Sequence, residues 1–381
     1  MMKPKIRFNG FIDDWEQRKF GELVDKYEDS VETPTDGYMR LGIRSHAKGT
    51  FYSYVEKGKE LEVAKMFRVA ANNFIVNITF GWEHAVAITD ENDAGKLVSH
   101  RFPQYQFNKG MIPKFFRYLI LDESFKHHLE LSSPGGAGRN RVLKLSDMLD
   151  YHMRFPSEQE QKKVATYFDT LDNLITLHQR KCDELKKLKK YMLQNMFPQN
   201  GENTPKIRFQ GFINAWEQRK LGDILDVRSG RDYKHLLEGS IPVYGTGGYM
   251  LSVNEALSYD EDAIGIGRKG TIDKPYILKA PFWTVDTLFY AVPRHKTDLN
   301  FTFGIFQNID WKKKDESTGV PSLSKTAINE IDILFPEYKE QQSIGRFFSN
   351  LDNLITLHQR KVEQMKNLKK YMLQNMFPAE K

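Results

Sequence analysis

Two stretches of this 381-residue chain occur twice with nearly the same sequence. Residues 4–23 and 205–224 share 14 of 20 positions at an offset of 201. Residues 171–198 and 351–378 share 23 of 28 positions at an offset of 180. Internal repeats of this kind decide the architecture before any single element is considered. The chain is therefore a tandem duplication.

The material between the repeated stretches differs in each copy. Residues 24–154 make a first insert of 131 residues, and residues 225–334 make a second insert of 110 residues with little obvious similarity to the first. We call the repeated stretches the frames. Nearly identical frames around unlike inserts suggest that the frames do one shared job while each insert meets a different target.

The second repeated stretch predicts a long helix in each copy, because its apolar residues recur at alternating spacings of three and four. Ser157 and Glu160 form a capping box after Pro156, and Pro198 ends the first helix. About 40 residues at 1.5 Å each give a rod of roughly 60 Å. The apolar seam needs a partner, and the other copy can supply one in a parallel or an antiparallel pair; the spacing does not choose.

The seam mixes apolar and polar residues. The predicted coiled-coil and partner-binding residues are Leu171, Leu174, His178, Leu185, Leu188 and Met192 in the first copy and Leu351, Leu354, His358, Met365, Leu368 and Met372 in the second. Buried polar positions set the register of a coiled coil at a cost in stability, which is one explanation for His178 and His358. The other explanation is that they face a third protein.

Both inserts combine short β-like runs with glycines and few helical segments. Residues 74–80, 85–89, 241–244 and 282–292 are rich in aromatic and β-branched residues, and residues 112–131 are the best helical candidate. We therefore expect an α/β (α+β) fold for each insert, with an antiparallel or mixed sheet.

Basic residues gather beside glycines in the loops of both inserts. The candidate DNA-binding residues are Arg40, Arg44, His46, Lys48, Tyr52, Arg139 and Arg141 in the first insert, and Arg228, Arg231, Lys234, Tyr244, Arg268, Lys269, Lys312 and Lys313 in the second. Arginine can grip guanine with two hydrogen bonds, worth about 1 to 3 kcal/mol of discrimination, while lysine holds phosphates. The alternative is that each is an ordinary solvated surface charge.

Composition narrows the classes of protein. The net charge of +6 and pI of about 9.0 raise the prior for a nucleic-acid partner without deciding it. A single cysteine, Cys182, cannot form an internal disulfide or a cysteine-rich metal site, and no apolar run of 18 residues occurs. We expect a soluble cytoplasmic protein without a metal site or a cofactor of its own.

Catalytic motifs are mostly missing. Residues 265–270 match G-x-G-x-x-G, but no amphipathic helix follows, so a glycine-rich turn is favoured over a dinucleotide site. Phosphate-loop and zinc-protease motifs do not occur, nor does the Pro-Pro dipeptide of adenine methyltransferases. No catalytic constellation stands out.

The combined pattern resembles a known family, the specificity subunit of type I restriction-modification systems, over essentially the whole chain. The residues that carry the resemblance are Trp15-Glu16, Phe155-Pro156 and Glu160-Gln161, their repeats Trp216-Glu217, Phe335-Pro336 and Glu340-Gln341, and the glycine-rich turns at 241–248 and 265–270.

The resemblance implies a non-catalytic subunit that reads a bipartite DNA sequence through two target-recognition domains. It implies antiparallel helices that fix the spacer between half-sites and dock two modification (methyltransferase) subunits. S-adenosylmethionine, ATP and Mg would then be bound by modification and restriction subunits only. The corresponding division is 1–155 for recognition domain 1, 156–198 for the first helix, 199–204 for a linker, 205–335 for recognition domain 2 and 336–378 for the second helix.

Two alternatives remain open. A coiled-coil scaffold or DNA-binding regulator that recruits no enzyme predicts helices that bury all their apolar surface against one another. A glycine-loop oxidoreductase or transferase predicts a nucleotide site at residues 265–270.

Overall fold

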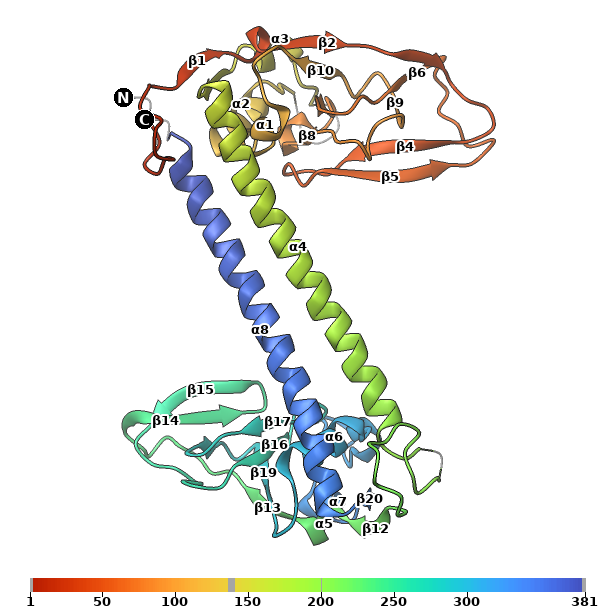
Figure 1. Ribbon diagram of the computed structural model, residues 1–381, viewed down its shortest axis with the longest axis vertical. Coiled ribbons are helices and arrows are strands. Elements are labelled where there is room, and N and C mark those ends of the chain that lie inside the picture. The colour runs from red at the N-terminus through yellow and green to blue at the C-terminus, as the bar shows by residue number, and fades with distance from the viewer. Residues whose placement is uncertain (1–2, 136–140, 200, 379–381) are drawn as a thin grey trace. The chain divides into compact units, whose positions relative to one another are not determined.

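The computed structural model describes residues 3–135, 141–199 and 201–378 of the chain, which divides into two compact units (Figure 1). Unit 1 comprises Met1–Leu177 and Val362–Lys381, and unit 2 comprises His178–Lys361. The boundaries cut across two long helices, α4 (Glu158–Asn195) and α8 (Tyr338–Met376), so each unit contains one insert and a part of both helices.

The helix segments run antiparallel within each unit. In unit 1, Lys369 Nζ of α8 lies 2.6 Å from an Asp172 oxygen of α4, and the Phe168 and Phe377 rings stack. In unit 2, Lys189 Nζ of α4 lies 2.6 Å from an Asp352 oxygen of α8. The structure thus decides the direction that the heptad spacing left open.

Unit 1 contains three sheets around its insert (Figure 1). The frame sheet pairs β1 (Glu16–Lys19) with β11 (His152–Phe155). A four-stranded antiparallel sheet has the order β2 (Val24–Tyr27), β10 (Gln104–Phe107), β7 (Asn73–Val76) and β8 (Val86–Ile88). A five-stranded mixed sheet has the order β3 (Ser30–Glu32), β6 (Lys65–Arg68), β9 (Leu97–Val98), β4 (Tyr38–Ile43) and β5 (Thr50–Val55). The helices are α1 (Pro113–Leu119), α2 (Glu123–Leu131) and α3 (Leu145–Leu149), with 3₁₀ turns η1 (Phe20–Glu22) and η2 (Gly81–Glu83).

Unit 2 follows the same plan with a different insert. Its frame sheet pairs β12 (Glu217–Lys220) with β20 (Asp332–Phe335). One sheet has the order β13 (Leu225–Ser229), β19 (Leu288–Pro293), β16 (Ala263–Gly267) and β17 (Tyr276–Leu278), and another β15 (Gly248–Val253), β14 (Glu238–Gly245) and β18 (Trp283–Thr284). The helices are α5 (Leu221–Ile224), α6 (Leu299–Asn308) and α7 (Lys325–Asn329), with the 3₁₀ turn η4 (Trp311–Lys314).

The two frames make equivalent contacts. In the frame sheets Glu16 is opposite Phe155, and Glu217 is opposite Phe335. The amide of Ile6 donates to the Asn375 carbonyl at 2.9 Å, and the amide of Ile207 donates to the Asn195 carbonyl at 2.9 Å. Each first repeated stretch therefore lies against the end of a long helix, and in unit 1 that joins residues from near both ends of the chain.

The core of each unit joins insert, frame and helix. In unit 1, Trp15, Phe115 and Phe168 share one buried cluster, and in unit 2 Trp216, Phe301 and Phe348 do the same. Burying several aromatic rings at this junction stabilises the insert on its frame. The insert is therefore seated by the same kind of packing in both units.

The α/β prediction is confirmed, with shifts inside the inserts. Strands occur near each predicted run, but 74–80 yields only the end of β7 before a turn, and 282–292 is split into β18 and β19. The helical candidate 112–131 is two helices, because Ile120–Asp122 breaks it and Asp122 has the extended backbone of an N-cap. Short polar residues at such a break favour a new helix start over continuation.

Candidate nucleic-acid interface and partner surface

A buried ion pair occupies the same frame position in both units. Two guanidinium nitrogens of Arg7 donate to the two carboxylate oxygens of Glu160 at 2.7 Å, and Arg208 holds Glu340 in the same way. The glutamate side chains are 2% and 0% exposed. These hydrogen bonds are the main reason that the pKa of both arginines is raised. The pair connects the first repeated stretch to the start of the long helix. Glu160 was expected in a capping box, but both of its carboxylate oxygens accept hydrogen bonds from Arg7.

The next residue, a glutamine in both copies, fastens the insert. Gln161 Oε1 accepts from the Ile112 amide, the N-cap residue of α1, at 2.9 Å. Gln341 Oε1 accepts from the Asp298 amide, the N-cap residue of α6, at 3.0 Å. Each glutamine also donates to the carbonyl of the proline five residues earlier at 2.9 Å. The repeated Glu-Gln pair thus connects all three parts of a unit.

One insert contact differs between the copies. The buried Tyr118 hydroxyl donates to Asp169 at 2.8 Å and to Asp172 at 3.0 Å, and burial is the largest cause of its raised pKa. Phe303 occupies the matching place in unit 2, because Lys189 lies over its ring as Lys369 lies over the Tyr118 ring. The position that matches Asp169 at the repeat offset of 180 is Ser349. The hydroxyl and one of its two acceptors have been replaced together, whereas the other acceptor, Asp172, is matched by Asp352.

The structure corrects the register of the predicted seam. The buried and half-buried seam residues are Leu171, Ile175, His178, Cys182, Leu185, Lys189 and Met192 on α4, with Met196 directly after it, and Leu351, Ile355, His358, Val362, Met365, Lys369, Met372 and Met376 on α8. The predicted seam residues Leu174, Leu188, Leu354 and Leu368 lie outside it and are 38% to 43% exposed. Two neighbouring stripes on each helix satisfy the same three-four spacing, and only packing selects between them.

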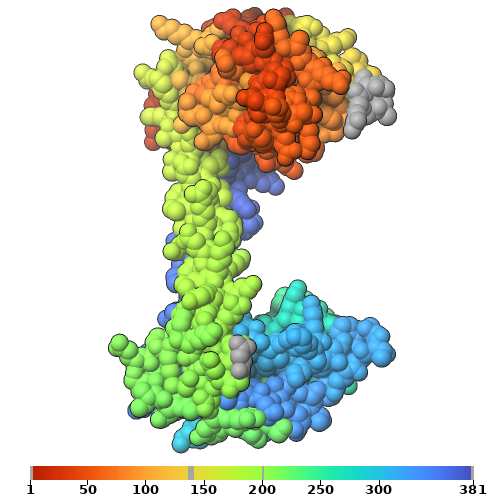
Figure 2. Space-filling view, turned by 90° about the vertical axis from the view of Figure 1, so that its right-hand side faces the viewer, coloured from red at the N-terminus to blue at the C-terminus, as the bar shows by residue number. Residues whose placement is uncertain are grey.

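The leucines left outside the seam form an exposed apolar patch in each unit. We define the unit 1 patch as Leu174, Leu177, Leu368 and Tyr371, and the unit 2 patch as Leu354, Leu357, Leu188 and Tyr191. Each member immediately precedes a seam residue, and on antiparallel helices that displacement places all four on one side of the pair. The surface of α4 is the yellow-green part of Figure 2. Exposed apolar patches of this kind mark interaction sites.

Two histidines meet in the seam of unit 2. His178 Nδ1 and His358 Nδ1 are 2.8 Å apart, a distance at which the N–H of one ring donates a hydrogen bond to the other ring. The pKa of His358 is lowered, first by burial and then by the neighbouring charges of His178, Lys361 and Lys181. The lowered pKa favours the neutral form of the His358 ring in this contact.

We expect the stability of unit 2 to fall as the pH drops from 7.5 to 5.5. The pKa of His358 is lower in the folded state than the ordinary value near 6.5, so below that value the unfolded state binds more protons and is favoured. In His358→Gln the urea midpoint should fall less over this range than in the unchanged protein. The exposed control His127→Gln should keep the full fall, and an unaltered fall in His358→Gln would contradict the assignment.

The structure places four predicted cationic residues of the first insert along one hairpin. Arg40 is half-buried on β4, whereas Arg44, His46 and Lys48 are exposed in the turn between β4 and β5. Tyr52 on β5 donates its hydroxyl to Asp93 at 2.8 Å. The hairpin turn therefore contains three of the basic residues that were predicted to bind DNA, and all three are exposed.

The remaining predicted DNA-binding residues of this insert, Arg139 and Arg141, are not in this hairpin. Arg141 donates to the carbonyls of Ser133 and Glu130 at 3.1 Å, and its guanidinium lies 5.2 Å from the Trp82 ring centroid. These contacts make it a residue that holds the chain locally. Arg139 lies outside the described residues.

In the second insert the structure separates engaged from available cations. Arg228, predicted as a DNA contact, forms ion pairs of 2.6 Å with Asp226 and Glu261, so acidic side chains already engage its charge. Hydrogen bonds to these carboxylates are the main cause of its raised pKa. Lys312 pairs with Asp273 at 3.0 Å and Lys313 with Asp310 at 3.2 Å, although both lysines stay exposed.

Two exposed arginines converge on one segment. The Arg231 amide donates to the Thr284 carbonyl at 2.9 Å, and the Arg268 amide donates to the Thr287 carbonyl at 2.8 Å. Arg231, Lys234, Arg268 and Lys269 are all exposed and form no ion pair with other described residues. Tyr244 is half-buried with its ring 6.3 Å from that of Tyr249, which is 63% exposed. This group is the candidate DNA surface of unit 2.

Sequence reasoning missed Phe51, Lys96 and Arg101 in the first insert. Lys96 Nζ lies 4.2 Å from the centroid of the Tyr52 ring. Phe51 and Tyr54 are 40% and 61% exposed on a strand, where exposed aromatic rings are a signal for ligand contact. Lys96 and Arg101 gave no sequence signal of their own.

The G-x-G-x-x-G segment is part of a sheet. Gly265 and Gly267 lie in β16, and a Cβ at Gly267 would come within 2.0 Å of the Thr271 carbonyl oxygen. The glycine is needed for this close backbone approach, and no helix begins at the turn. The phosphate-binding geometry of a dinucleotide fold is therefore not formed here.

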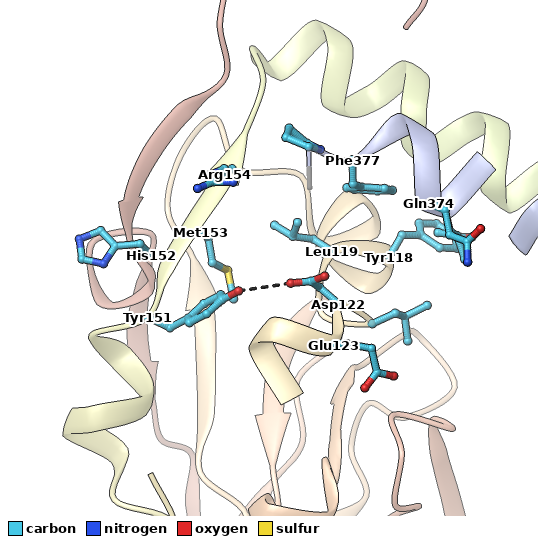
Figure 3. A pocket seen from close by; sticks show the side chains of 13 residues that line it. Tyr118, Leu119, Asp122, Glu123, Tyr151, His152, Met153, Arg154, Gln374 and Phe377 are labelled. Atoms are coloured by element: carbon cyan, nitrogen blue, oxygen red, sulfur yellow. Dashed lines mark hydrogen bonds between the residues drawn. The ribbon is translucent and has the colours of Figure 1, made fainter. Parts of the chain in front are cut away.

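Each unit also contains a cavity beside the end of a long helix. In unit 1 (Figure 3) about 230 Å³ is enclosed by the α1–α2 junction, β11 and the end of α8, with Tyr151 donating to Asp122 at 3.3 Å. In unit 2 about 550 Å³ is enclosed by the end of α6, β20 and the residues after α4. Phe377 and Phe197, which match at the repeat offset, line the two cavities.

Two kinds of feature are absent from the described residues. Over residues 3–135, 141–199 and 201–378, no helix is apolar over enough length to span a bilayer. In the same part of the chain no three histidine, cysteine, aspartate or glutamate side chains are grouped as metal ligands.

Comparison with known proteins gives a consistent family. Residues 12–187 and 214–367 each match the family model described as the type I restriction modification DNA specificity domain. The type I restriction enzyme MjaVIII specificity subunit of Methanocaldococcus jannaschii is 24% identical over 410 residues, covering 95% of this chain and 91% of that subunit. The MjaIX specificity subunit of the same organism is 27% identical over 136 residues, 32% of this chain and 29% of that subunit. The crystal structure of a type I restriction-modification S subunit from M. genitalium has the same fold, with a TM-score of 0.70, 17% identity and 100% coverage of both chains.

Proposed function

Since the chain belongs to the type I restriction modification DNA specificity domain family, we propose that it is the non-catalytic specificity subunit of a restriction-modification complex. In this role it reads a bipartite DNA sequence with its two inserts and docks modification (methyltransferase) subunits on its helices. S-adenosylmethionine, ATP and Mg belong to the modification and restriction subunits, and the complex works in the cytoplasm.

The observation that carries the proposal is the contrast between frames and inserts. The Arg-Glu pair and the Glu-Gln connection are the same in both units, whereas the inserts differ in sheets, lengths and exposed cations. A subunit that binds one DNA through two different recognition domains needs frames that are the same in both copies and inserts that differ. Arg231, Lys234, Arg268 and Lys269 in unit 2, and the β4–β5 turn in unit 1, supply the positive charge that a DNA reader needs.

The exposed patches favour recruitment of an enzyme over a stand-alone regulator. A scaffold or regulator without a partner would bury its apolar seam completely, but each unit leaves three leucines and a tyrosine exposed beside it. The two patches contain the same residue types because they come from the repeated stretch. They therefore suit two copies of the same partner, which we assign as the modification subunit.

Co-purification with the candidate modification subunit, followed by mapping of methylated adenines in genomic DNA, tests the proposal. We expect methylation at a single two-part sequence with a fixed spacer. Methylation without sequence preference, or an unbroken palindromic site, would contradict two-headed reading. The same map supplies the target DNA for the experiments below.

Arg268→Ala should weaken binding to the second half-site about fivefold to 100-fold, because one arginine contact to a base is worth about 1 to 3 kcal/mol. Binding is measured on DNA with one half-site scrambled at a time, at fixed salt. The variant should lose affinity where only the second half-site remains and keep it where only the first remains. Arg219→Ala, which removes an exposed frame arginine, is the matched control. Equal losses on both DNAs would argue against modular reading.

A further inference from the structure

The first insert contains a cavity that the proposed reading of base edges does not use. It has a volume of about 310 Å³ and lies between β4, β5, the turn that follows β7 and the loop that follows β9. Its lining includes three phenyl rings, those of Phe51, Phe80 and Phe102, and five polar side chains, those of Arg40, Asn77, Thr79, Ser99 and Arg101. A cavity of this size is at the lower end of the range for ligand sites.

One ring of the lining, that of Phe51, is held in place by backbone. Phe51 is opposite Gly42 in the β4–β5 register, and a Cβ at Gly42 would come within 2.4 Å of the Phe51 ring. The ring therefore lies directly on the Gly42 backbone, a contact that any larger residue would prevent. The Arg44 guanidinium carbon lies 5.4 Å from the ring centroid. Although 40% exposed, Phe51 is positioned before any ligand arrives.

The polar groups of the lining suit a base attached to its phosphate. Arg101 Nη1 contacts the Thr79 hydroxyl at 3.4 Å, and Asn77 Oδ1 accepts from the Thr79 amide at 3.1 Å. Arg101 is exposed, so its charge remains available to a phosphate at the rim. Amide and hydroxyl groups beside aromatic rings are what proteins use to hold a base that has left its stack.

The aromatic lining of the cavity indicates whether its ligand is a base inside the duplex or a base that has left it. Bases inside a duplex present only their edges in the grooves. A cavity walled by phenyl rings offers contacts to the face of a base, which becomes accessible only when the base leaves the helix. Arg40 and Phe51, on adjacent strands, would then contact one nucleotide that the duplex has released.

We propose that this cavity of unit 1 receives a single nucleobase turned out of the bound DNA duplex, stacked on Phe51 with its phosphate near Arg101. The inference rests on the proposed function and adds a second mode of reading to it. Since the cavity belongs to an insert and not to a frame, it contributes to recognition of the first half-site only.

A mismatch scan of the target DNA tests the inference in the complex with modification subunits. At each position of the first half-site, one base is kept and its partner is replaced by a non-complementary base. At one position the mismatch should tighten binding about tenfold or more, because an unpaired base costs less to turn out. Phe51→Ala should abolish this gain and weaken binding to matched DNA about fivefold to 100-fold, the range measured for loss of one base–aromatic stack.

Two further variants separate the ring's position from its presence. Gly42→Ala should displace the Phe51 ring and abolish the gain as well, although the phenyl group is retained. Tyr54→Ala, which removes a 61% exposed ring from the other face of β5, should keep the gain. Unchanged affinity for the second half-site verifies that each variant is folded.

The outcomes distinguish the two levels of the argument. If matched target DNA is bound specifically but no mismatch tightens binding, or if the gain survives in Phe51→Ala, the base-binding cavity is refuted and the specificity role stands. If the complex prefers no DNA sequence at all, the proposed function fails and the cavity has no nucleic-acid ligand.

Discussion

Replacing Glu340 with glutamine should lower the free energy of unfolding of unit 2 by about 3 to 5 kcal/mol. The Glu340 carboxylate is 0% exposed and accepts from two nitrogens of Arg208, whose side chain is only 14% exposed. The substitution leaves the guanidinium buried opposite an amide, without a compensating charge. Chemical denaturation followed by tryptophan fluorescence measures the change, because Trp216 belongs to the same core.

An exposed pair in the same unit provides the control for Glu340→Gln. Glu217 and Arg219 are 2.8 Å apart but 69% and 47% exposed, so Glu217→Gln should change stability by no more than about 1 kcal/mol. Glu160→Gln should repeat the large effect in unit 1, since Arg7 is held in the same geometry. Similar small losses for all three variants would show that the frame pairs do not fasten the units.

The frames could be predicted from the sequence because local periodicity and duplication carry their information. The repeated residues predict two long helices that pack against each other. The Phe-Pro and Glu-Gln pairs also occur in both copies, which indicates that they belong to the shared part of each unit. The contacts of those residues could not be predicted from the sequence. Arg7 and Glu160 are 153 residues apart, and neither segment contains a pattern that indicates the other as its partner. Long-range ion pairs become visible only when the fold brings them together.

The three-four spacing correctly predicted a packed seam but did not identify which of two neighbouring stripes of residues forms it. Leu174 and Ile175 are neighbours, and each belongs to a stripe with three-four spacing, so the helix has more apolar surface than one seam can bury. Packing buried Cys182 and Met196, half-buried Ile175, and left Leu174 and Leu188 exposed. The excess of leucine that made the register ambiguous is the same excess that forms the patches.

The candidate DNA surface was the least predictable part of the chain. Arg228 and Arg268 both stand near glycine in loop-like sequence, yet Arg228 forms an ion pair with Glu261, 33 residues away, whereas Arg268 forms no ion pair with any described residue. A list of cations does not reveal which ones acidic side chains occupy in the fold. Phe51 was missed for a similar reason, since its role depends on Gly42 in the strand opposite.

Leu188→Asp combined with Tyr191→Asp should weaken binding of a modification subunit at the unit 2 patch about 100-fold or more. These side chains are 43% and 56% exposed in the isolated chain, so the charges cost little before docking. In a docked interface the same carboxylates would be desolvated next to apolar surface, and central interface residues carry about 2 kcal/mol or more each. Native mass spectrometry of the complex should show one modification subunit in place of two.

The repeat provides the tests of this prediction. Leu368→Asp with Tyr371→Asp should remove the other modification subunit, because these residues match Leu188 and Tyr191 at the offset of 180. All four substitutions together should remove both. Lys186→Asp adds a carboxylate to an exposed position away from the stripe of α4 and should leave two subunits bound. Two subunits on the fourfold variant would mean that the patches are not the docking surface, and one subunit on either double variant would show that each unit recruits its own copy.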